Sequence, residues 1–130
     1  NLALDRIIKI DYDFQMPFLE YSFDVEKYYK NVIGVTVNEG LQPKPIQLWI
    51  DKINAPYVLT KPLHHSQRLL QQNEDGSIII NLFLIENYEM ERLLLGFGDG
   101  LEVLKPERLR NRMKSILEKA IKKYDIKDEN

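Results

Sequence analysis

Hydrophobic residues follow recognisable periods along the second half of the chain. In PIQLWID (residues 45–51) they occupy every second position, which predicts a half-buried strand. HSQRLLQQ (65–72) alternates less strictly and predicts a second strand. The nearly continuous apolar run SIIINLFLI (77–85) predicts a third strand that is central and well covered, and LEVLKP (101–106) predicts a short fourth strand.

Helical periodicity and capping residues fill the intervals between these strands. Pro56 suits the first turn of a helix that ends before Pro62, and Asn87 caps a helix over 88–97. Pro106 begins a long final helix. The order is therefore β-α-β-β-α-β followed by a helix, which predicts an α+β fold of the ferredoxin-like class, with both crossover helices on one face of the sheet.

The two faces of this sheet are expected to differ. The tight turn at Asp75 and Gly76 makes the central hairpin antiparallel, and Gly76 supplies the positive φ that the turn needs. The face opposite the crossover helices also needs cover, which the final helix or a partner subunit can supply. Trp49 is expected on one of the two faces.

The N-terminal part of the chain follows a different pattern. NLALDRIIKIDYDF (1–14) alternates like a strand, and a lone strand is not stable in water, so we expect it to be the end of a truncated domain. SFDVEKYYKNVIG (22–34) predicts a connector helix, with Asp24 as N-cap and Gly34 just after the C-terminus. The predicted domains are residues 1–21 (truncated strand or strands), 22–42 (connector helix and linker) and 43–130 (ferredoxin-like domain), with the boundary between residues 36 and 44.

Composition narrows the class of protein. The chain has 130 residues, of which 44% are hydrophobic, enough for one domain with a real core. The net charge of −2 favours no global partner, and the absence of cysteine excludes disulfides, thiolate metal sites and cysteine nucleophiles. No apolar stretch is long enough to span a membrane, and the N-terminus does not resemble a signal peptide. We expect a cytoplasmic protein with no membrane partner.

The only two histidines, His64 and His65, stand side by side in PLHHSQRL (62–69). Adjacent residues of a strand point to opposite faces, and no further histidine or cysteine completes a ligand set. We therefore expect no metal site. A role in opening the strand is favoured over contact with a ligand, which stays an alternative.

Other chemical motifs are weak. GFGDG (96–100) follows a helix and precedes a strand, the reverse of a phosphate-binding loop, so a turn is expected. No serine stands in a frame typical of a nucleophile. An RNA-binding sheet of this fold class uses aromatic residues on its first and third strands, and the third strand offers only Phe83. We expect no catalytic residues and no cofactor.

The final helix combines an apolar stripe with a basic surface. Seven basic residues stand against two acidic ones over 106–124, a charge of about +5. Basic residues in the last turn suit the helix dipole, and an anionic ligand or a subunit is the alternative role. The stripe consists of Leu109, Met113, Ile116, Leu117, Ala120, Ile121 and Tyr124.

The ordered set of segments resembles a known family. LALDRIIKI followed by FDVEKYYKNVIGV is similar to the end of a WYL domain and the connector after it. PLHHSQRL, DGSIIINLFL, YEMERLLLGFG and LEVLKPERLRNRM, between about Lys44 and Tyr124, are similar to the C-terminal extension that follows WYL domains. The likeness covers nearly the whole chain.

The resemblance implies a bacterial transcriptional regulator. Such a protein has an N-terminal winged helix that binds operator DNA, a WYL barrel of SH3-like fold and the extension. The winged helix and the residues that name the WYL domain would lie upstream, and Trp49 is not the tryptophan of that name. Operator DNA is therefore expected to be a partner only through the missing winged helix. The family's effectors are nucleotides or nucleic acids, and its extension is associated with dimer contacts.

From this resemblance we expect a non-enzymatic region that senses an effector and forms a homodimer. The resemblance implies that its ligand is a nucleotide or a single-stranded nucleic acid. An anionic ligand of this kind needs cations on a semi-enclosed surface. Arg6 matches an arginine in the family's closing motif. The expected ligand-binding residues are Arg6, Lys9, His65, Gln67 and Arg68. The alternative is a structural dimerisation module without a ligand of its own.

Overall fold

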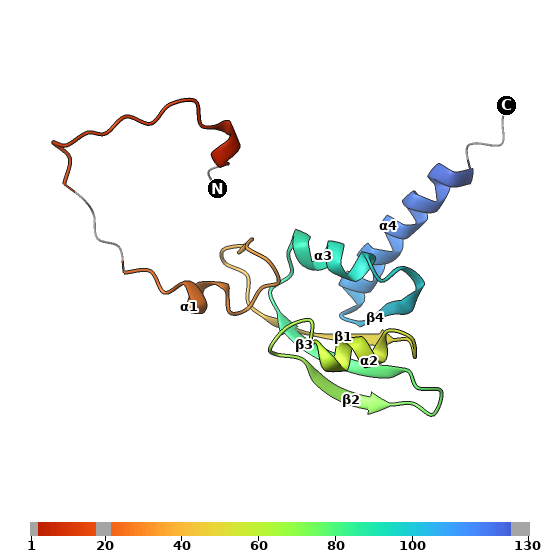
Figure 1. Ribbon diagram of the computed structural model, residues 1–130. Coiled ribbons are helices and arrows are strands. Elements are labelled where there is room, and N and C mark those ends of the chain that lie inside the picture. The colour runs from red at the N-terminus through yellow and green to blue at the C-terminus, as the bar shows by residue number, and fades with distance from the viewer. Residues whose placement is uncertain (1–2, 18–21, 126–130) are drawn as a thin grey trace.

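The computed structural model describes residues 3–17 and 22–125 (Figure 1). Its strands are β1 (Lys44–Ile50), β2 (Arg68–Gln72), β3 (Ile78–Leu84) and β4 (Leu101–Lys105). Its α-helices are α1 (Val25–Tyr29), α2 (Ala55–Thr60), α3 (Tyr88–Leu95) and α4 (Glu107–Asp125). Two 3-10 turns, η1 (Leu4–Arg6) and η2 (Gly98–Gly100), complete the described elements.

The four strands form one antiparallel sheet in the order β2-β3-β1-β4. This order, with α2 between β1 and β2 and α3 between β3 and β4, is the ferredoxin-like arrangement predicted from the sequence. The central position predicted for β3 is also confirmed. The register between β1 and β3 is regular over its whole length, whereas β2 and β4 each carry an irregularity at the edge of the sheet.

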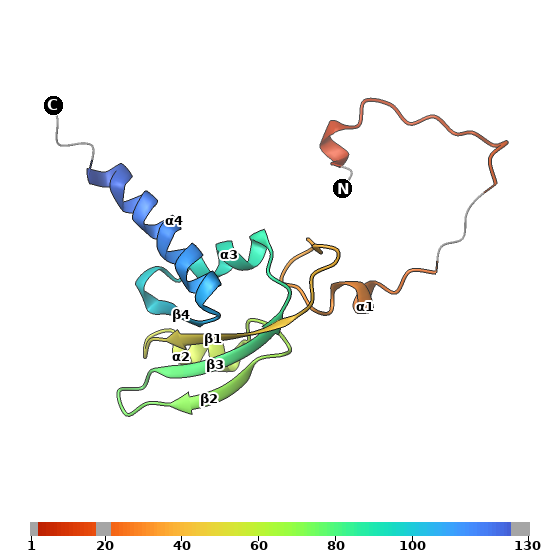
Figure 2. The same ribbon diagram turned by 180° about the vertical axis from the view of Figure 1, so that it is seen from behind.

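One face of the sheet carries the core. Ile46, Leu48 and Ile50 of β1 are fully buried, and each faces an equally buried residue of β3. Met90, Leu94 and Leu109 bring α3 and the start of α4 into the same cluster, and Ala55 and Val58 add α2. Seen from behind, β1, β3 and β2 have no helix in front of them (Figure 2). The apolar period of two therefore places one row under the helices and leaves the other row open.

Local chemistry fixes the turns where the sequence predicts them. Gly76 has φ of 90° in the β2–β3 turn. Next to it, Asp75 Oδ1 accepts from Ser77 N (2.9 Å) and from Ser77 Oγ (2.6 Å). These bonds hold the pKa of the Asp75 carboxyl below its ordinary value. Asn87 Oδ1 accepts from Met90 N at 2.8 Å, which confirms it as the N-cap of α3.

The N-terminal segment differs from its prediction. Residues 3–17 contain the turn η1 and no strand, and all of them are exposed. A strand needs a neighbour that satisfies its backbone groups, and no described segment pairs with this one. Its alternation is therefore not sufficient to make it a strand in this structure.

The connector helix is shorter than predicted. Asp24 is its N-cap, as predicted, and accepts from Lys27 N at 3.1 Å. The helix ends at Tyr29, so Gly34 is not its C′ residue. Gly34 instead adopts φ of 77° where a Cβ would lie 2.7 Å from Glu89 Cγ, so a side chain at residue 34 would be both strained and crowded.

The long helix α4 packs over its first half only. Leu109 and Met113 are buried, but Leu117 is 44%, Ile121 60% and Tyr124 81% exposed. In Figure 1 the C-terminal half of α4 extends away from the sheet. The predicted apolar stripe is thus continuous in sequence but covered only near the sheet. No helix in the described ranges is long and apolar enough to cross a membrane.

Candidate functional site

The two histidines join the connector to the ferredoxin-like domain. His64 Nε2 lies 2.9 Å and His65 Nε2 lies 2.7 Å from the same atom, the carbonyl oxygen of Lys30 at the end of α1. The two ring centroids are 4.0 Å apart. A carbonyl oxygen only accepts, so both Nε2 atoms act as donors. The pair therefore fastens α1 to the loop that precedes β2.

The partners of His64 select one protonation state. Ser66 N donates to His64 Nδ1 at 3.2 Å, and Ser66 Oγ lies 2.7 Å from the same nitrogen. Phe83 N donates to Ser66 Oγ, which leaves the hydroxyl hydrogen free to point at His64. His64 is therefore neutral, with its proton on Nε2. Burial, and secondly the charge of His65, hold the pKa of His64 below its ordinary value, against the opposing effect of the Lys30 carbonyl.

This geometry gives the histidines a structural role. Both Nε2 atoms are used on a carbonyl, and a metal ligand needs a free lone pair instead. Among the residues that the structure describes, no group of three or more His, Cys, Asp or Glu side chains is placed to hold a metal ion. The contacts with Lys30 and Ser66 support a role of the two histidines in holding this loop in place.

Gln67 and Arg68 follow the histidines at the start of β2, and they differ in how far their side chains are free to bind a ligand. Gln67 Oε1 accepts from Leu63 N and its Nε2 donates to Val58 O, both at 2.9 Å, so this side chain ties the loop to α2. Arg68 Nη1 donates to the carbonyl oxygens of Gln67 (2.8 Å) and His65 (3.3 Å). Arg68 is exposed and begins β2. Of the three predicted ligand-binding residues in this loop, Arg68 is the one with an exposed charge.

Arg6 and Lys9 belong to a different part of the molecule. Both are exposed, on the segment before α1 (Figure 1). Lys9 Nζ lies 3.0 Å from Asp11 Oδ1, a pair that is exposed on both sides. The structure does not bring these two residues together with the loop of residues 63–68.

The helix-free face of the sheet carries a polar row across all four strands. Gln47 on β1 faces Asn81 on β3, which faces Arg68 on β2, and on the other side Gln47 faces Lys105 on β4. Paired residues of an antiparallel sheet lie on the same face. The row therefore has a cation at each end and two amides between them.

Aromatic residues flank this row on the two central strands. Trp49 faces Ile79 on one side of it, and Phe83 faces Pro45 on the other. Trp49 is half-buried and Phe83 is 48% exposed. Sequence reasoning on the third strand identifies Phe83 alone; the register adds Trp49 to the same face.

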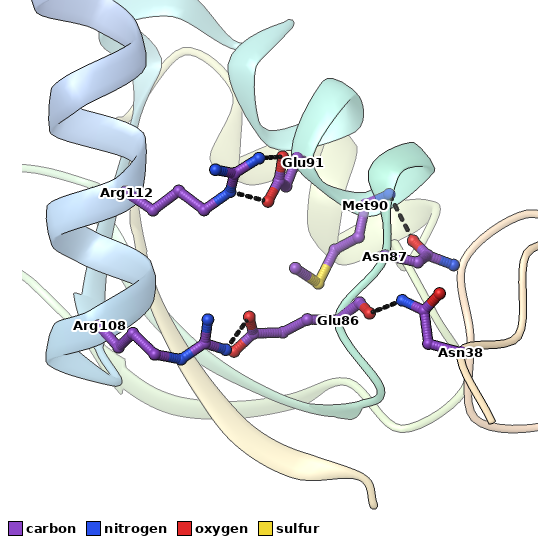
Figure 3. Close-up of polar contacts among 7 residues, drawn as sticks. All are labelled: Asn38, Glu86, Asn87, Met90, Glu91, Arg108 and Arg112. Carbon is purple, nitrogen blue, oxygen red and sulfur yellow. Dashed lines mark hydrogen bonds and ion pairs between the residues drawn. The ribbon is translucent and has the colours of Figure 1, made fainter. Parts of the chain in front are cut away.

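The linker after α1 is fixed against the start of α3. Asn87 Nδ2 donates to the carbonyls of Ile33 and Thr36, both at 2.8 Å. Asn38 Nδ2 donates to Glu86 O at 2.9 Å (Figure 3). Thr36 Oγ1 donates to Glu89 Oε1 at 2.7 Å, and this bond holds the pKa of the Glu89 carboxyl below its ordinary value. Residues 33–38 are therefore held on the ferredoxin-like domain.

The arginines of α4 are occupied by nearby carboxylates. Arg108 pairs with Glu86, which precedes α3, and Arg112 pairs with Glu91 of α3 (Figure 3). Arg110 pairs with Glu102. The basic surface expected from the helix sequence is therefore neutralised over the half that packs on the sheet.

Sequence reasoning misses several of these positions. The carbonyl of Lys30 carries no side-chain signal at all, and Gln47, Asn81 and Lys105 look like ordinary polar residues of strands. A signal exists for Asn81, because the turn at Gly76 sets the β2–β3 register approximately, whereas Gln47 and Lys105 lie on strands that this turn does not align. No such signal links Lys30 to the histidines.

Comparison with known proteins identifies the family of this fold. The family model of the WCX domain matches residues 42–121, more than half of the chain. The match begins just before β1 and ends in the exposed half of α4. A search of curated proteins found no match. The chain belongs to the WCX domain family, a C-terminal domain of WYL-type regulators.

Proposed function

We propose that this chain is a non-enzymatic regulatory region that binds a nucleotide or a single-stranded nucleic acid on the helix-free face of its sheet. The observation that carries the proposal is the row of Arg68, Asn81, Gln47 and Lys105 between two aromatic residues. Membership in the WCX family supports a regulatory role. The match to this family does not define a ligand, so the ligand and its place on the sheet are our proposal.

The chemistry of the face suits such a ligand. Bases stack on exposed aromatic rings, and Trp49 and Phe83 are separated by four residues along the strands, about 14 Å. Arg68 and Lys105 can bind phosphate, and the amides of Gln47 and Asn81 can bond to the edges of bases. Glu102, the carboxylate opposite Trp49, is already paired with Arg110. Its charge therefore opposes an anion less than a free carboxylate would.

Arg68 also offers a route from the ligand to the connector. Its guanidinium bonds to the carbonyl of His65, and His65 bonds to Lys30. A phosphate that draws Arg68 away from the loop would loosen the loop that fastens α1. Binding on the sheet would in this way change the hold on the segment that leads to the rest of a regulator.

The experiment uses Trp49, the only tryptophan of the chain, as the reporter. Oligothymidylate is titrated at low salt and the fluorescence of Trp49 is followed. We expect saturable quenching that weakens with added salt, and about tenfold weaker binding in Arg68→Ala. Lys119→Ala, which removes an exposed cation from the far half of α4, is the matched control and should bind as the wild type does.

Two results would contradict the proposal. One is an unchanged Trp49 signal at every oligonucleotide concentration. The other is equal weakening in Arg68→Ala and Lys119→Ala, because this would indicate attraction by overall charge rather than binding at the sheet. A parallel titration with inorganic phosphate tells whether the bases contribute, since phosphate alone cannot stack.

A second candidate function, dimerisation, is favoured by the outer half of α4. Exposed Leu117 and Ile121 border a hollow of about 310 Å³ whose other walls include Leu95 and Leu101. A second copy of this chain is the proposed occupant. Lys114 and Glu118 stand at the rim, 3.8 Å apart, and opposite charges so placed can pair across a two-fold axis.

Sedimentation of two matched variants tests this second function. Ile121→Asp should shift the chain toward monomer, because a buried carboxylate in an apolar interface is costly. Ile53→Asp introduces the same change at a position on a surface turn that is 68% exposed, compared with 60% for Ile121, and should leave association unchanged. A wild-type chain that stays monomeric at high concentration would rule the interface out.

A further inference from the structure

We propose that His64 and His65 form an acid-sensitive latch, which holds α1 on the domain while His64 is neutral and releases it when His64 gains a proton. This inference goes beyond the proposed function, because it needs neither a ligand nor a second copy. It rests on the hydrogen bonds that surround the two rings.

The neutral form of His64 uses every polar atom of its ring. Nε2–H donates to Lys30 O, and Nδ1 accepts from the backbone and hydroxyl of Ser66. A second proton would have to sit on Nδ1, where it would point at the Ser66 N–H. Ser66 Oγ accepts from Phe83 N at 3.0 Å, so one lone pair is left to accept the new proton, while the Ser66 N–H on the same nitrogen would oppose it. Protonation therefore reverses the Ser66 hydroxyl contact and turns the Ser66 N–H contact from attractive to repulsive.

His65 makes the protonated state of His64 less favourable still. Its ring centroid is 4.0 Å from that of His64, so two positive rings would repel each other directly. His65 is exposed, whereas His64 is half-buried and has the two Ser66 contacts on its other nitrogen. The asymmetry places the sensitive step on His64 and the supporting contact on His65.

The surrounding charges do not offset this repulsion. From α1 and its flanks, Asp24, Glu26, Lys27, Tyr29 and Lys30 line the hollow that His65 faces, two carboxylates against two ammonium groups. On the loop itself, Arg68 adds a further cation whose guanidinium bonds to the His65 carbonyl. Neither imidazole forms an ion pair with a carboxylate in the described part of the chain.

The direction of the pH effect follows from the lowered pKa of His64. The ordinary pKa of a histidine is about 6.5. When α1 is docked, the pKa of His64 lies below this value, so His64 gains its proton only at lower pH. The undocked state therefore holds more protons between these two values, and docking weakens as the pH falls through that window. Above it the latch contributes its full stabilisation.

Release would be confined to α1. Residues 33–38 keep their own bonds to Asn87 and Glu89, and Ile85 N donates to Asn31 O at 2.8 Å, none of which involves an imidazole. The latch would thus free the helix without freeing the linker behind it. A conformational change at the connector would follow the pH while the ferredoxin-like domain stays folded.

Hydrogen exchange of the full chain tests the latch. Exchange in the peptide that covers residues 24–32 is measured between about pH 5.5 and 8 and corrected for the intrinsic rate. We expect protection of this peptide, which contains the Tyr28 and Val32 amide bonds, to be lost at the acid end. Peptides from β1 and β3 should keep theirs and so report an intact fold.

Three variants separate the latch from a general effect of acid. In His64→Gln the side-chain amide can still donate to Lys30 O but cannot titrate, so protection should no longer depend on pH. In His65→Gln the pH dependence should persist. In His64→Ala the peptide should exchange rapidly at every pH. The proposal is overturned if the wild type shows equal protection across the range, or if His64→Gln retains the wild-type pH dependence.

Discussion

The two faces of the sheet are built by the same strands and behave differently. Under the helices, Leu48 faces Ile80 and Ile46 faces Leu82, and all four are fully buried. On the open face the alternate positions hold amides, aromatics and the terminal cations Arg68 and Lys105. A face that needs no helix must be made of residues that water tolerates, which leaves it available for a ligand. The stability of the fold therefore depends on the covered face, and the opposite face can bind a ligand.

Neighbouring residues of β3 provide the strongest test of this comparison. Leu82→Ala should lower the free energy of unfolding by about 2–5 kcal/mol, because it removes a fully buried side chain and leaves a cavity. Urea denaturation followed by circular dichroism measures the loss. A cost below about 1 kcal/mol would mean that the covered face is loosely packed.

The next largest effect is expected from a substitution at the N-terminus of α3, one of the helices that cover the buried face of the sheet. Asn87→Ala removes the N-cap and leaves the carbonyls of Ile33 and Thr36 without their donor, so we expect a loss of about 2 kcal/mol in urea denaturation. Asn38→Ala is the control, because Asn38 donates a single exposed bond to Glu86 O and should cost much less. Equal losses in the two variants would show that the three bonds of Asn87 contribute no more than the single exposed bond of Asn38.

A larger side chain on the open face should matter less than the leucine beside it. Phe83 is 48% exposed, so Phe83→Ala should cost about 1 kcal/mol, although it removes more atoms than Leu82→Ala. The same variant should weaken oligothymidylate binding, since it deletes one of the two stacking rings. Should Phe83→Ala destabilise as strongly as Leu82→Ala, the open face would be packed against something in solution.

The smallest effect on stability is expected from the ion pair between α3 and α4. Arg112 bonds to Glu91, and this pairing raises the pKa of the guanidinium further, so the arginine stays charged at every accessible pH. Arg112→Ala should lower the urea midpoint slightly at low salt and not at all near 1 M salt, because exposed pairs are screened. Lys119→Ala should show no change in either buffer. A loss that persists in high salt would mean that Arg112 acts through packing.

Much of the fold could be predicted from local patterns. Four predicted features each depend on only a few consecutive residues, and all four are confirmed. They are the alternation in β1, the alternation in β3, the N-cap Asn87 and the turn at Gly76. The opening segment shows the limit of this reasoning. Its alternation meets the local condition for a strand, but pairing is a non-local condition, and the described residues do not supply a partner.

The site depends mainly on non-local contacts. Lys30 O meets His64 and His65 across 34 and 35 positions, and it does so with a backbone atom that no residue type reveals. Arg112 likewise bonds to Glu91, which lies 21 positions earlier in the chain. A reading of α4 alone therefore counts cations that the tertiary structure has already neutralised. Arg68 and Phe83 could be selected in advance, because each belongs to a strand that the local pattern predicts.

The irregularity between Leu69 and Gln71 has a consequence for the solubility of the protein. β2 is an edge strand with two exposed leucines, Leu69 and Leu70, and a straight edge of this kind is a template on which other chains can add strands. A break in the spacing of backbone donors and acceptors makes the edge a poor template. We therefore expect the bulge to make β2 less prone to add strands from other chains, while the side chains of the open face keep their places.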